Sequence, residues 1–501
     1  MLDKLPRIFL AAEPLTRNAR AYVTNLGRPC WSGKGSCWLC SCFVHELNKD
    51  QQCETASSPL TLQSFLLISS ERPHIMAQNK NPRPRWVLHI QAQFWRVLMS
   101  IGMLLHKLAS PRPPKPTFTR TIKSTVSTKG GSFDICFYVP RDYNFQRQNG
   151  FKKVRHGKGY PIVINFHGGG FTLGTSHDDA RWIGTVVDEC YAVVASVEYR
   201  LAPENAFPTA VDDGADAVLY VADHAEELGI DKNKIALSGF SSGGNMCFTV
   251  PLRLYDYLTD FARPMSRNPR EALCRTITSA SMQGVTPNAS AAASSSSVAA
   301  KPLMPNAGES NLAVPTAAGT SKAPAVWQKE APTINLCSIV PWYPSCDYTR
   351  TREQRRATLI RKDQDLPALF TNLFDESYLH PPDTIPLDSP YLSPGLTSDE
   401  HLRDALPKDI IMYTCEWDML LAEGRALYER LVGKEVGKKV VYTMIPGVPH
   451  GWDKAPNPVK PTPGVKEHYL KACKELRRVF EDKVSEADLM DRRRKSVPVV
   501  R

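Results

Sequence analysis

The sequence lacks a regular cysteine framework. Its 13 cysteines are an odd number at spacings that do not repeat, which argues against the disulfide scaffold of a small secreted domain. Cys37-x-x-Cys40, with His45 nearby, could bind zinc, but no second C-x-x-C pair follows and we expect no metal there. Five other cysteines lie in apolar strand or helix patterns, and we expect them to be buried free thiols: Cys136, Cys190, Cys247, Cys337 and Cys415.

Two long stretches lack the periodic apolar residues that build a core. Residues 1–75 show neither sustained periodicity nor a clean signal-peptide pattern. We expect them to be disordered or an upstream extension of the gene model, with Met76 as the natural start. Thr286–Lys322 is mostly Ala, Ser, Pro and Gly and cannot offset its ordering entropy, so we expect a disordered insertion over 262–330. Residues 481–501 are expected to form a basic tail.

A nucleic-acid-binding signature is also missing. The formal net charge is +11, from 62 Lys and Arg against 51 Asp and Glu, and such an excess can favour nucleic acid or an anionic membrane surface. Much of the excess lies in short basic runs such as Pro82–Arg85 and Arg492–Lys495. We therefore expect no nucleic-acid partner.

In contrast to these missing features, one motif that is present predicts a catalytic nucleophile. The stretch Gly239–Gly244, which reads Gly-Phe-Ser-Ser-Gly-Gly, follows an apolar strand-like run and precedes a stretch that can start a helix. A G-x-S-x-G between a strand and a helix is typical of a nucleophile elbow. The glycines are needed because the turn is tight and a side chain on either would collide with the crossing backbone. The turn would lift the hydroxyl of Ser241 to where a base can reach it.

A glycine-rich turn one strand–helix unit earlier supports this interpretation. His167–Phe171, which reads His-Gly-Gly-Gly-Phe, directly follows the strand-like run 160–166. Three glycines leave backbone N–H groups unshielded, and an oxyanion hole needs such donors. We therefore predict that the backbone of Gly168, Gly169 and Gly170, with the N–H of Ser242, forms the oxyanion hole.

These motifs together resemble the hormone-sensitive-lipase-like family of α/β-hydrolases, also called the GDXG or fold-3 esterases. The resemblance covers about residues 117–480. The elbow departs from the family's Gly-Asp-Ser-Ala-Gly-Gly at Phe240 and Ser242, and neither change touches the nucleophile. The motifs that carry the resemblance are His167–Phe171, Glu198–Glu204, Gly239–Gly244, Glu416–Leu420 and Pro449–Gly451.

The fold class follows from the resemblance and from the strand pattern. Strand signals near 161–166, 192–198, 234–238, 334–340, 409–415 and 439–445 alternate with helical ones, which predicts a mostly parallel sheet covered on both faces. Two further strands are expected at 117–128 and 132–139, joined at Gly130-Gly131. The resemblance implies an eight-stranded α/β-hydrolase domain over 117–480. It also implies a cap made by the insertion 347–408, which includes a helix near 366–379, and by N-terminal helices.

The nucleophile needs a base and a carboxylate, and both are expected after strands. His450 follows the last predicted strand, and Asp418 follows the strand before it, where α/β sites gather. Glu416 and Glu423 compete for the carboxylate role, but Asp418 aligns with the first Asp of the family's D-P-L-x-D-E pattern. The order Ser241, Asp418, His450 is that of α/β-hydrolases. The resemblance gives structural roles to His167, which would shape the oxyanion loop, and to Glu204, which would make hydrogen bonds.

Residues 86–108 are expected to form a long amphipathic helix within the segment 76–116. Its polar residues form one narrow stripe among Trp, Phe, Leu, Ile, Val and Met: His89, Gln93, Arg96, Ser100 and Lys107. The helix could belong to the cap or a groove, lie on a membrane surface, or span a bilayer. Arg96 at mid-span and the basic flanks favour the membrane surface over a full span.

The sequence predicts a serine esterase, lipase or deacetylase that cleaves small to medium hydrophobic carboxylic esters without metal or organic cofactor. Within the family it is similar to fungal steryl-acetate and arylacetamide-type deacetylases, which act near membranes. One alternative is an amide or formamide hydrolase with the same three residues. Another is a non-catalytic ligand-binding protein like the gibberellin receptors, which lack the histidine. Localisation on the endoplasmic reticulum or another lipid surface, or in the cytoplasm, fits the sequence, and the oligomeric state, including a homodimer, stays open.

Overall fold

The computed structural model describes residues 83–151, 154, 159–262 and 334–481. All of them belong to one unit of the chain, Pro59–Arg501. The predictions for residues 1–75, for the insertion up to 330, for the basic tail and for the Cys37-x-x-Cys40 pair lie outside the described residues.

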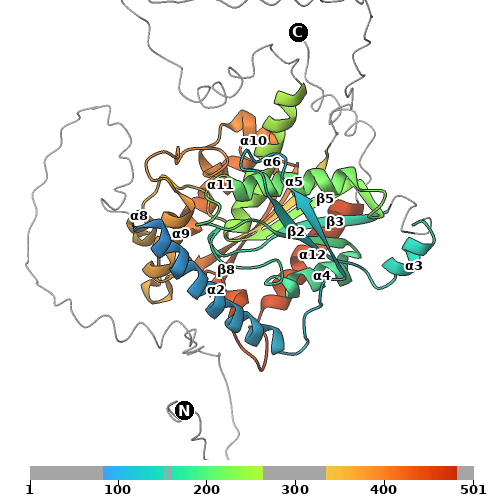
Figure 1. Cartoon of the computed structure of the whole chain (residues 1–501), viewed down its shortest axis with the longest axis horizontal. Coiled ribbons are helices and arrows are strands. Elements are labelled where there is room, and N and C mark those ends of the chain that lie inside the picture. The colour runs from blue at the N-terminus through green and yellow to red at the C-terminus, as the bar shows by residue number, and fades with distance from the viewer. Residues whose placement is uncertain (1–82, 152–153, 155–158, 263–333, 482–501) are drawn as a thin grey trace, which may run out of the picture. The chain divides into compact units, whose positions relative to one another are not determined.

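The centre of the fold is an eight-stranded sheet in the order β1-β2-β4-β3-β5-β6-β7-β8 (Figure 1). The pairs β1–β2 and β2–β4 are antiparallel, and the other neighbours are parallel. The expected strands are therefore present, in a mostly parallel sheet. Their bounds are β1 Phe118–Lys123, β2 Ser132–Tyr138, β3 Tyr160–Phe166, β4 Val193–Glu198, β5 Ile230–Phe240, β6 Leu336–Trp342, β7 Asp409–Trp417 and β8 Lys439–Pro449.

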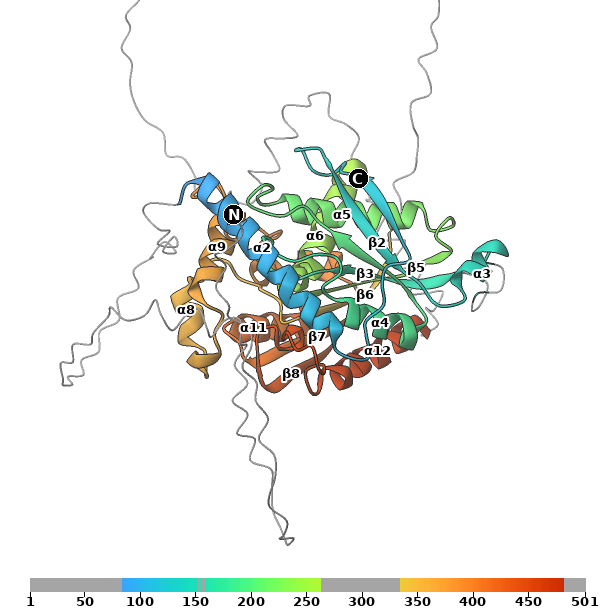
Figure 2. The same ribbon diagram turned by 60° about the horizontal axis from the view of Figure 1, so that its bottom comes forward.

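Helices cover both faces of the sheet, as predicted. Figure 2 shows α5 and α6 on one side of it and α4 and α12 on the other. The described helices are α2 Arg85–Leu108, α3 Tyr143–Gln148, α4 Ala180–Cys190, α5 Thr209–Asp223, α6 Ser242–Ala262, α8 Arg352–Ala357, α9 Ala368–Tyr378, α10 Asp399–Ala405, α11 Leu421–Val432 and α12 Val465–Glu481, with short 3-10 turns η2 Lys362–Gln364, η3 Pro394–Leu396 and η4 Trp452–Lys454.

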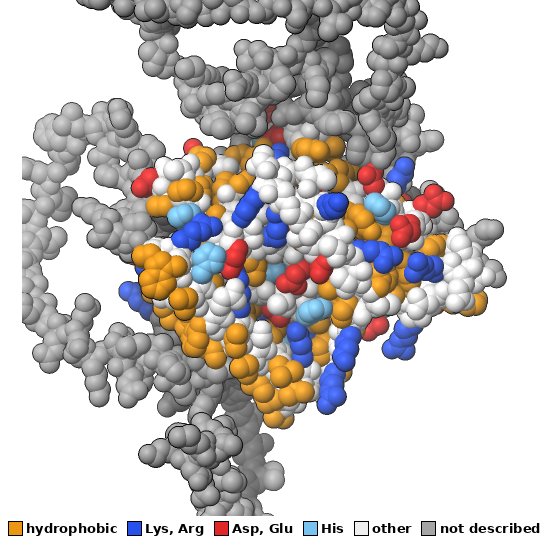
Figure 3. Space-filling view, viewed as in Figure 1, with side chains coloured by type: hydrophobic (Ala, Val, Ile, Leu, Met, Phe, Trp, Pro, Cys, Tyr) orange, Lys and Arg blue, Asp and Glu red, His pale blue; other side chains and the backbone are white. Residues whose placement is uncertain are grey.

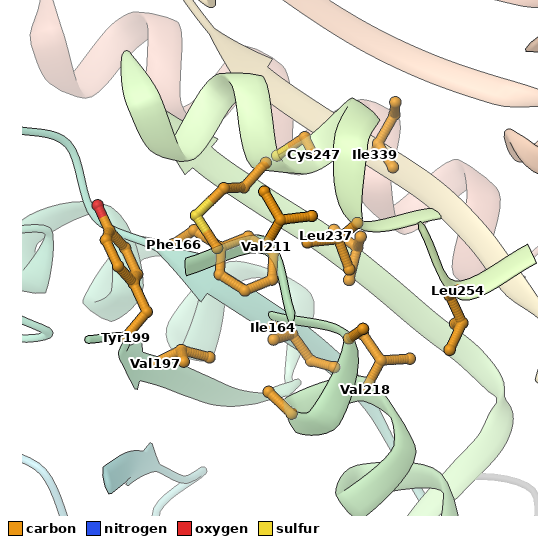
Figure 4. Packing of buried hydrophobic residues seen from close by; sticks show 14 of the residues in the cluster. Ile164, Phe166, Val197, Tyr199, Val211, Val218, Leu237, Cys247, Leu254 and Ile339 are labelled. Atoms are coloured by element: carbon orange, nitrogen blue, oxygen red, sulfur yellow. The ribbon is translucent and has the colours of Figure 1, made fainter. Parts of the chain in front are cut away.

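Two apolar cores follow from the alternation of side chains along the strands. On β3, Ile164 and Phe166 point into the core under α5 and α6, whereas Val163 points into the core under α4 and α12. Figure 4 shows Ile164 and Phe166 packed with Val211 of α5 and Cys247 of α6. Because both faces are buried, the parallel strands are apolar along most of their length, and the polar ends of the strands are left for the site.

The first strand is shorter than predicted. The prediction extended it to residue 128, but β1 ends at Lys123. The carboxylate of Asp216 accepts hydrogen bonds from the backbone N–H of Thr125 and Val126 and from the hydroxyl of Ser124. These bonds draw the chain out of the ladder, so the connection to β2 begins well before Gly130-Gly131.

The buried-thiol prediction is confirmed. Cys136, Cys190, Cys247 and Cys415 are buried free thiols, as are Cys346 and Cys473, and the buried Cys337 donates to the carbonyl oxygen of Ile235. No helix in the described part of the chain combines the length and the apolarity needed to cross a membrane.

Candidate active site

The turn between β5 and α6 places Ser241 above the end of the sheet. Its φ of 55° is a left-handed conformation that residues other than glycine seldom adopt. A Cβ on Gly239 would lie 2.2 Å from the carbonyl oxygen of Gly243, and one on Gly243 would lie 2.0 Å from that of Phe166. The two glycines are therefore required by close backbone approach, as the elbow motif predicted.

Three of the predicted site residues meet through a continuous chain of hydrogen bonds. His450 Nε2 lies 2.8 Å from Ser241 Oγ, and His450 Nδ1 lies 2.7 Å from Asp418 Oδ2. The other carboxylate oxygen of Asp418 accepts the backbone N–H of Leu420 at 2.9 Å. Asp418 directly follows β7 and His450 directly follows β8. The parallel strands thus bring together residues that are 209 positions apart in the chain.

The two competing glutamates are occupied elsewhere. Glu416 accepts the backbone N–H of Gly447 at 2.6 Å. Glu423 is buried, pairs with Arg355 at 2.9 Å and accepts the backbone N–H of Cys346. Burial raises the pKa of Glu423, although Arg355 opposes that shift. Asp418 is therefore the carboxylate that contacts the imidazole.

The glycine-rich turn after β3 lies next to the elbow. Gly170 and Ser242 line the same pocket as Ser241 and His450. Gly168 and Gly169 lie in the tight turn that leads to it, where a Cβ on Gly169 would meet the carbonyl oxygen of Leu173 at 2.2 Å. Gly170 and Ser242 thus lie on the pocket wall, and Gly168 is close to the elbow, since a Cβ on it would lie 3.5 Å from that of Ser241. The oxyanion role of Gly168, Gly169, Gly170 and Ser242 stays a prediction.

His167 and Glu204 contact other parts of the protein. The ring of His167 is buried, stacks on Tyr199 at 4.2 Å and has Nδ1 2.8 Å from the carbonyl oxygen of Gly168. Glu204 accepts hydrogen bonds from Arg96 and Gln93 of α2. His167 thus holds the glycine turn, and Glu204 holds a helix.

The pocket over Ser241 is small. Its volume is about 30 Å³, enough for roughly two water molecules. The ring of Phe374 on α9 closes one side, because a Cβ on Gly170 would meet it at 2.3 Å. The lining residues that no sequence motif indicated come largely from the segment 347–408: Ser345, Tyr348, Arg352, Leu366, Thr371, Phe374, Asp375 and Tyr378.

A buried charge cluster behind the site was also missed by sequence reasoning. Lys454 Nζ lies 2.9 Å from both Asp179 Oδ1 and Asp453 Oδ2, and 3.6 Å from the ring centre of Phe240. Burial disfavours the ammonium, but the two carboxylates outweigh it and raise the pKa of Lys454. The cluster joins the elbow to the loop that carries His450. Its one sequence signal was the aromatic Phe240 in place of the family's acidic residue.

This arrangement has the parts of an acyl-transfer site. A hydroxyl, an imidazole and a carboxylate in hydrogen-bonded order can generate a nucleophile and stabilise the imidazolium that forms. Within the described ranges, no group of three or more His, Cys, Asp or Glu side chains is placed to hold a metal ion.

Comparison with known proteins agrees with the geometry. A family model for the alpha/beta hydrolase fold matches residues 163–301 and 317–454. A crystallised esterase of Pyrobaculum calidifontis has the same fold, with a TM-score of 0.50, 22% identity and coverage of 80% of this chain and 99% of that chain.

Curated relatives match over shorter stretches. An AB hydrolase superfamily protein of Schizosaccharomyces pombe is 44% identical over 88 residues, which is 18% of this chain and 26% of that protein. An arylesterase of Saccharolobus solfataricus is 35% identical over 164 residues, which is 33% of this chain and 48% of that protein. Human hormone-sensitive lipase is 38% identical over 96 residues, which is 19% of this chain and 9% of that protein. The chain spans less than half the length of each of these relatives, but the family model covers more than half of the chain. The chain therefore belongs to the alpha/beta hydrolase fold family, in its hormone-sensitive-lipase-like branch.

Proposed function

We propose that this protein is a serine hydrolase that cleaves carboxylic esters through an acyl-enzyme. One observation carries the proposal: Ser241, His450 and Asp418 are hydrogen-bonded in order at 2.8 and 2.7 Å beside the glycine turn. The names of the partial relatives, which include an arylesterase, carboxylesterases and hormone-sensitive lipases, support the same reaction class.

The reaction follows from the geometry. Ser241 Oγ forms a bond to the acyl carbon while His450 Nε2 takes its proton, and Asp418 holds the imidazolium through Nδ1. The negative oxygen of the tetrahedral intermediate is stabilised by backbone N–H groups of the Gly168–Gly170 turn and of Ser242. His450 then gives its proton to the alcohol as the bond to the acyl carbon breaks. Water repeats the sequence to release the acid and restore the hydroxyl of Ser241.

The pocket favours a short apolar acyl group. Phe374, Tyr378 and Met419 contribute apolar surface to the pocket. Its 30 Å³ hold about two water molecules, so a longer acyl chain needs Phe374 to move.

The test is hydrolysis of p-nitrophenyl acetate by Ser241→Ala. Since the change deletes only the hydroxyl, the variant should fold normally and lose at least about three orders of magnitude in kcat. Ser100→Ala removes a hydroxyl that bonds its own helix at Arg96 and should keep full activity as the matched control. Turnover close to wild type in folded Ser241→Ala contradicts the assignment. A matched ester and anilide pair then separates ester from amide cleavage, with the ester expected to react faster.

A further inference from the structure

The helix α2 exposes an apolar stripe along its whole length. The residues lie four, four, three, four, three and four positions apart, so they share one face of the helix. Their exposed fractions run from 44 to 66%, and Figure 3 shows hydrophobic side chains gathered along α2 from its N-terminal end at the left to the bottom of the view. The α2 stripe consists of Trp86, Ile90, Phe94, Val97, Ile101, Leu104 and Leu108.

The face of α2 opposite the stripe is buried, and one flank of the helix is held to the domain by polar contacts. Arg96 donates to both carboxylate oxygens of Glu204 at 3.0 and 2.8 Å and to the carbonyl oxygens of Thr172 and Ala202. Farther along the helix, Lys107 lies 3.6 Å from Asp178. Arg96 and Lys107 of the predicted polar stripe thus contact the protein, whereas Gln93 and Ser100 stay exposed. Because these contacts fix the rotation of the helix, the α2 stripe cannot roll inward to be covered.

The α2 stripe runs beside the segment that covers the pocket. Trp95 of α2 packs edge-on against Phe370 of α9, with ring centres 4.6 Å apart. Leu369, next to Phe370, is itself 46% exposed. Leu366 and Phe374 of the same segment line the pocket over Ser241. An apolar surface therefore continues from α2 towards the entrance of the site.

The charges around α2 indicate what covers the stripe. From Arg83 to Phe133 the chain contains no Asp or Glu. Arg112 and Lys115, just beyond the helix, are exposed cations. Seven apolar side chains over 23 residues extend about 33 Å at 1.5 Å per residue, in a straight ridge and not a groove. A ridge of this kind with cations at its C-terminal end matches the surface of an anionic bilayer, where a helix lies in the plane of the headgroups.

We propose that α2 docks the protein on an anionic lipid surface, with the α2 stripe inserted among the acyl chains and Arg112 and Lys115 at the headgroups. The docking itself does not depend on the proposed ester hydrolysis. If that function holds, the same contact lets a hydrophobic ester move from the lipid along α2 and α9 to Ser241.

The test is co-sedimentation of the full chain with vesicles at physiological salt. Wild type should sediment with vesicles of phosphatidylcholine that contain phosphatidylserine, and less with phosphatidylcholine alone. The triple variant Phe94→Ser, Val97→Ser and Ile101→Ser should weaken binding at least about tenfold, because three inserted side chains are removed. The matched control changes three apolar side chains that are exposed elsewhere, Phe145, Val432 and Val459, to Ser and should bind like wild type.

A second variant guards against a loss of folding. Arg112→Glu with Lys115→Glu alters exposed side chains outside any helix, and it should reduce binding to the anionic vesicles several-fold. Turnover of p-nitrophenyl acetate serves as the folding control for both variants. The proposal is overturned if wild type stays in the supernatant, if the triple variant binds as well as wild type, or if wild type is a dimer that the triple variant dissociates, since a second copy would then cover the α2 stripe.

Discussion

Helices α2 and α12 are both amphipathic, but they bury different shares of their apolar surface. On α12 the apolar positions are buried, and Tyr469 packs edge-on against Trp182 and Trp342 with ring centres 5.3 Å apart. On α2 the seven-residue α2 stripe faces outward, and a shorter set is buried: Leu88, Ala92, Gly102, Met103 and His106. An aromatic cluster faces α12, whereas the carboxylates of Glu204 and Asp178 bind the flank of α2. Periodicity shows that a helix has two faces, and its neighbours decide which face is buried.

The largest difference in the free energy of unfolding is expected between two leucine truncations, one on α12 and one on α2. Leu476→Ala on α12 removes a fully buried side chain and should lower the free energy of unfolding by about 2–5 kcal/mol. Leu104→Ala on α2, where the side chain is 59% exposed, should change it by less than about 0.5 kcal/mol. Denaturant unfolding of both variants measures the contrast. Equal losses would mean that the α2 stripe is covered in the folded protein.

A smaller change in the free energy of unfolding is expected when the pH is lowered, because α2 contains one buried histidine, His106. Burial, with help from Lys454 and Arg181, lowers the pKa of His106 from 6.5 to about 4, although Asp453 and a contact with the carbonyl oxygen of Ala455 oppose this. The unfolded chain then binds the proton first, so this stability is complete above pH 6.5 and is lost as pH falls towards 4. Between pH 6.5 and 5 the loss should be roughly 2 kcal/mol.

Unfolding free energies measured across this pH range check the prediction. His106→Gln, which cannot be protonated, should flatten that part of the profile relative to wild type. A profile that is unchanged by the substitution would show that another group causes the pH dependence and that His106 does not hold the end of α2.

The smallest change in the free energy of unfolding is expected when the surface ion pair between α12 and α4 is removed. Arg477 and Glu189 lie 2.9 Å apart, but both side chains are more than a third exposed. Arg477→Gln should therefore cost less than about 1 kcal/mol, and high salt should reduce even that difference. Thermal unfolding at low and high salt measures it. A larger loss that high salt reduces would show that charge, and not packing alone, holds α12.

Local patterns were sufficient to predict much of this protein. The strands were predicted because runs buried on both faces are continuously apolar. Ser241 and His450 were predicted from motifs that follow strands, and Asp418 was preferred to Glu416 and Glu423 through the resemblance to the family's pattern. The meeting of Ser241, Asp418 and His450 in space follows from a parallel sheet, and their catalytic roles are the proposal made above. The glycine-rich turn at 167–171 was predicted in the same way, because it also directly follows a strand.

The rest depends on contacts between distant parts of the chain. No local signal shows that Asp216 ends β1, that Lys454 rests on the ring of Phe240, or that Arg352 and Tyr348 reach the pocket. The rotation of α2 was equally inaccessible, because it is set by Glu204, which lies 108 residues after Arg96.

That separation has a consequence for how the protein is made. Arg96 is synthesised 108 residues before Glu204, which at about 5–20 residues per second is a delay of roughly 5–20 seconds. A helix can form within about a microsecond, so α2 can form long before Glu204 is made. During that interval its apolar side chains have no domain to cover them. If α2 docks on a lipid surface as proposed, the order of synthesis presents the α2 stripe to lipid before the hydrolase domain has folded.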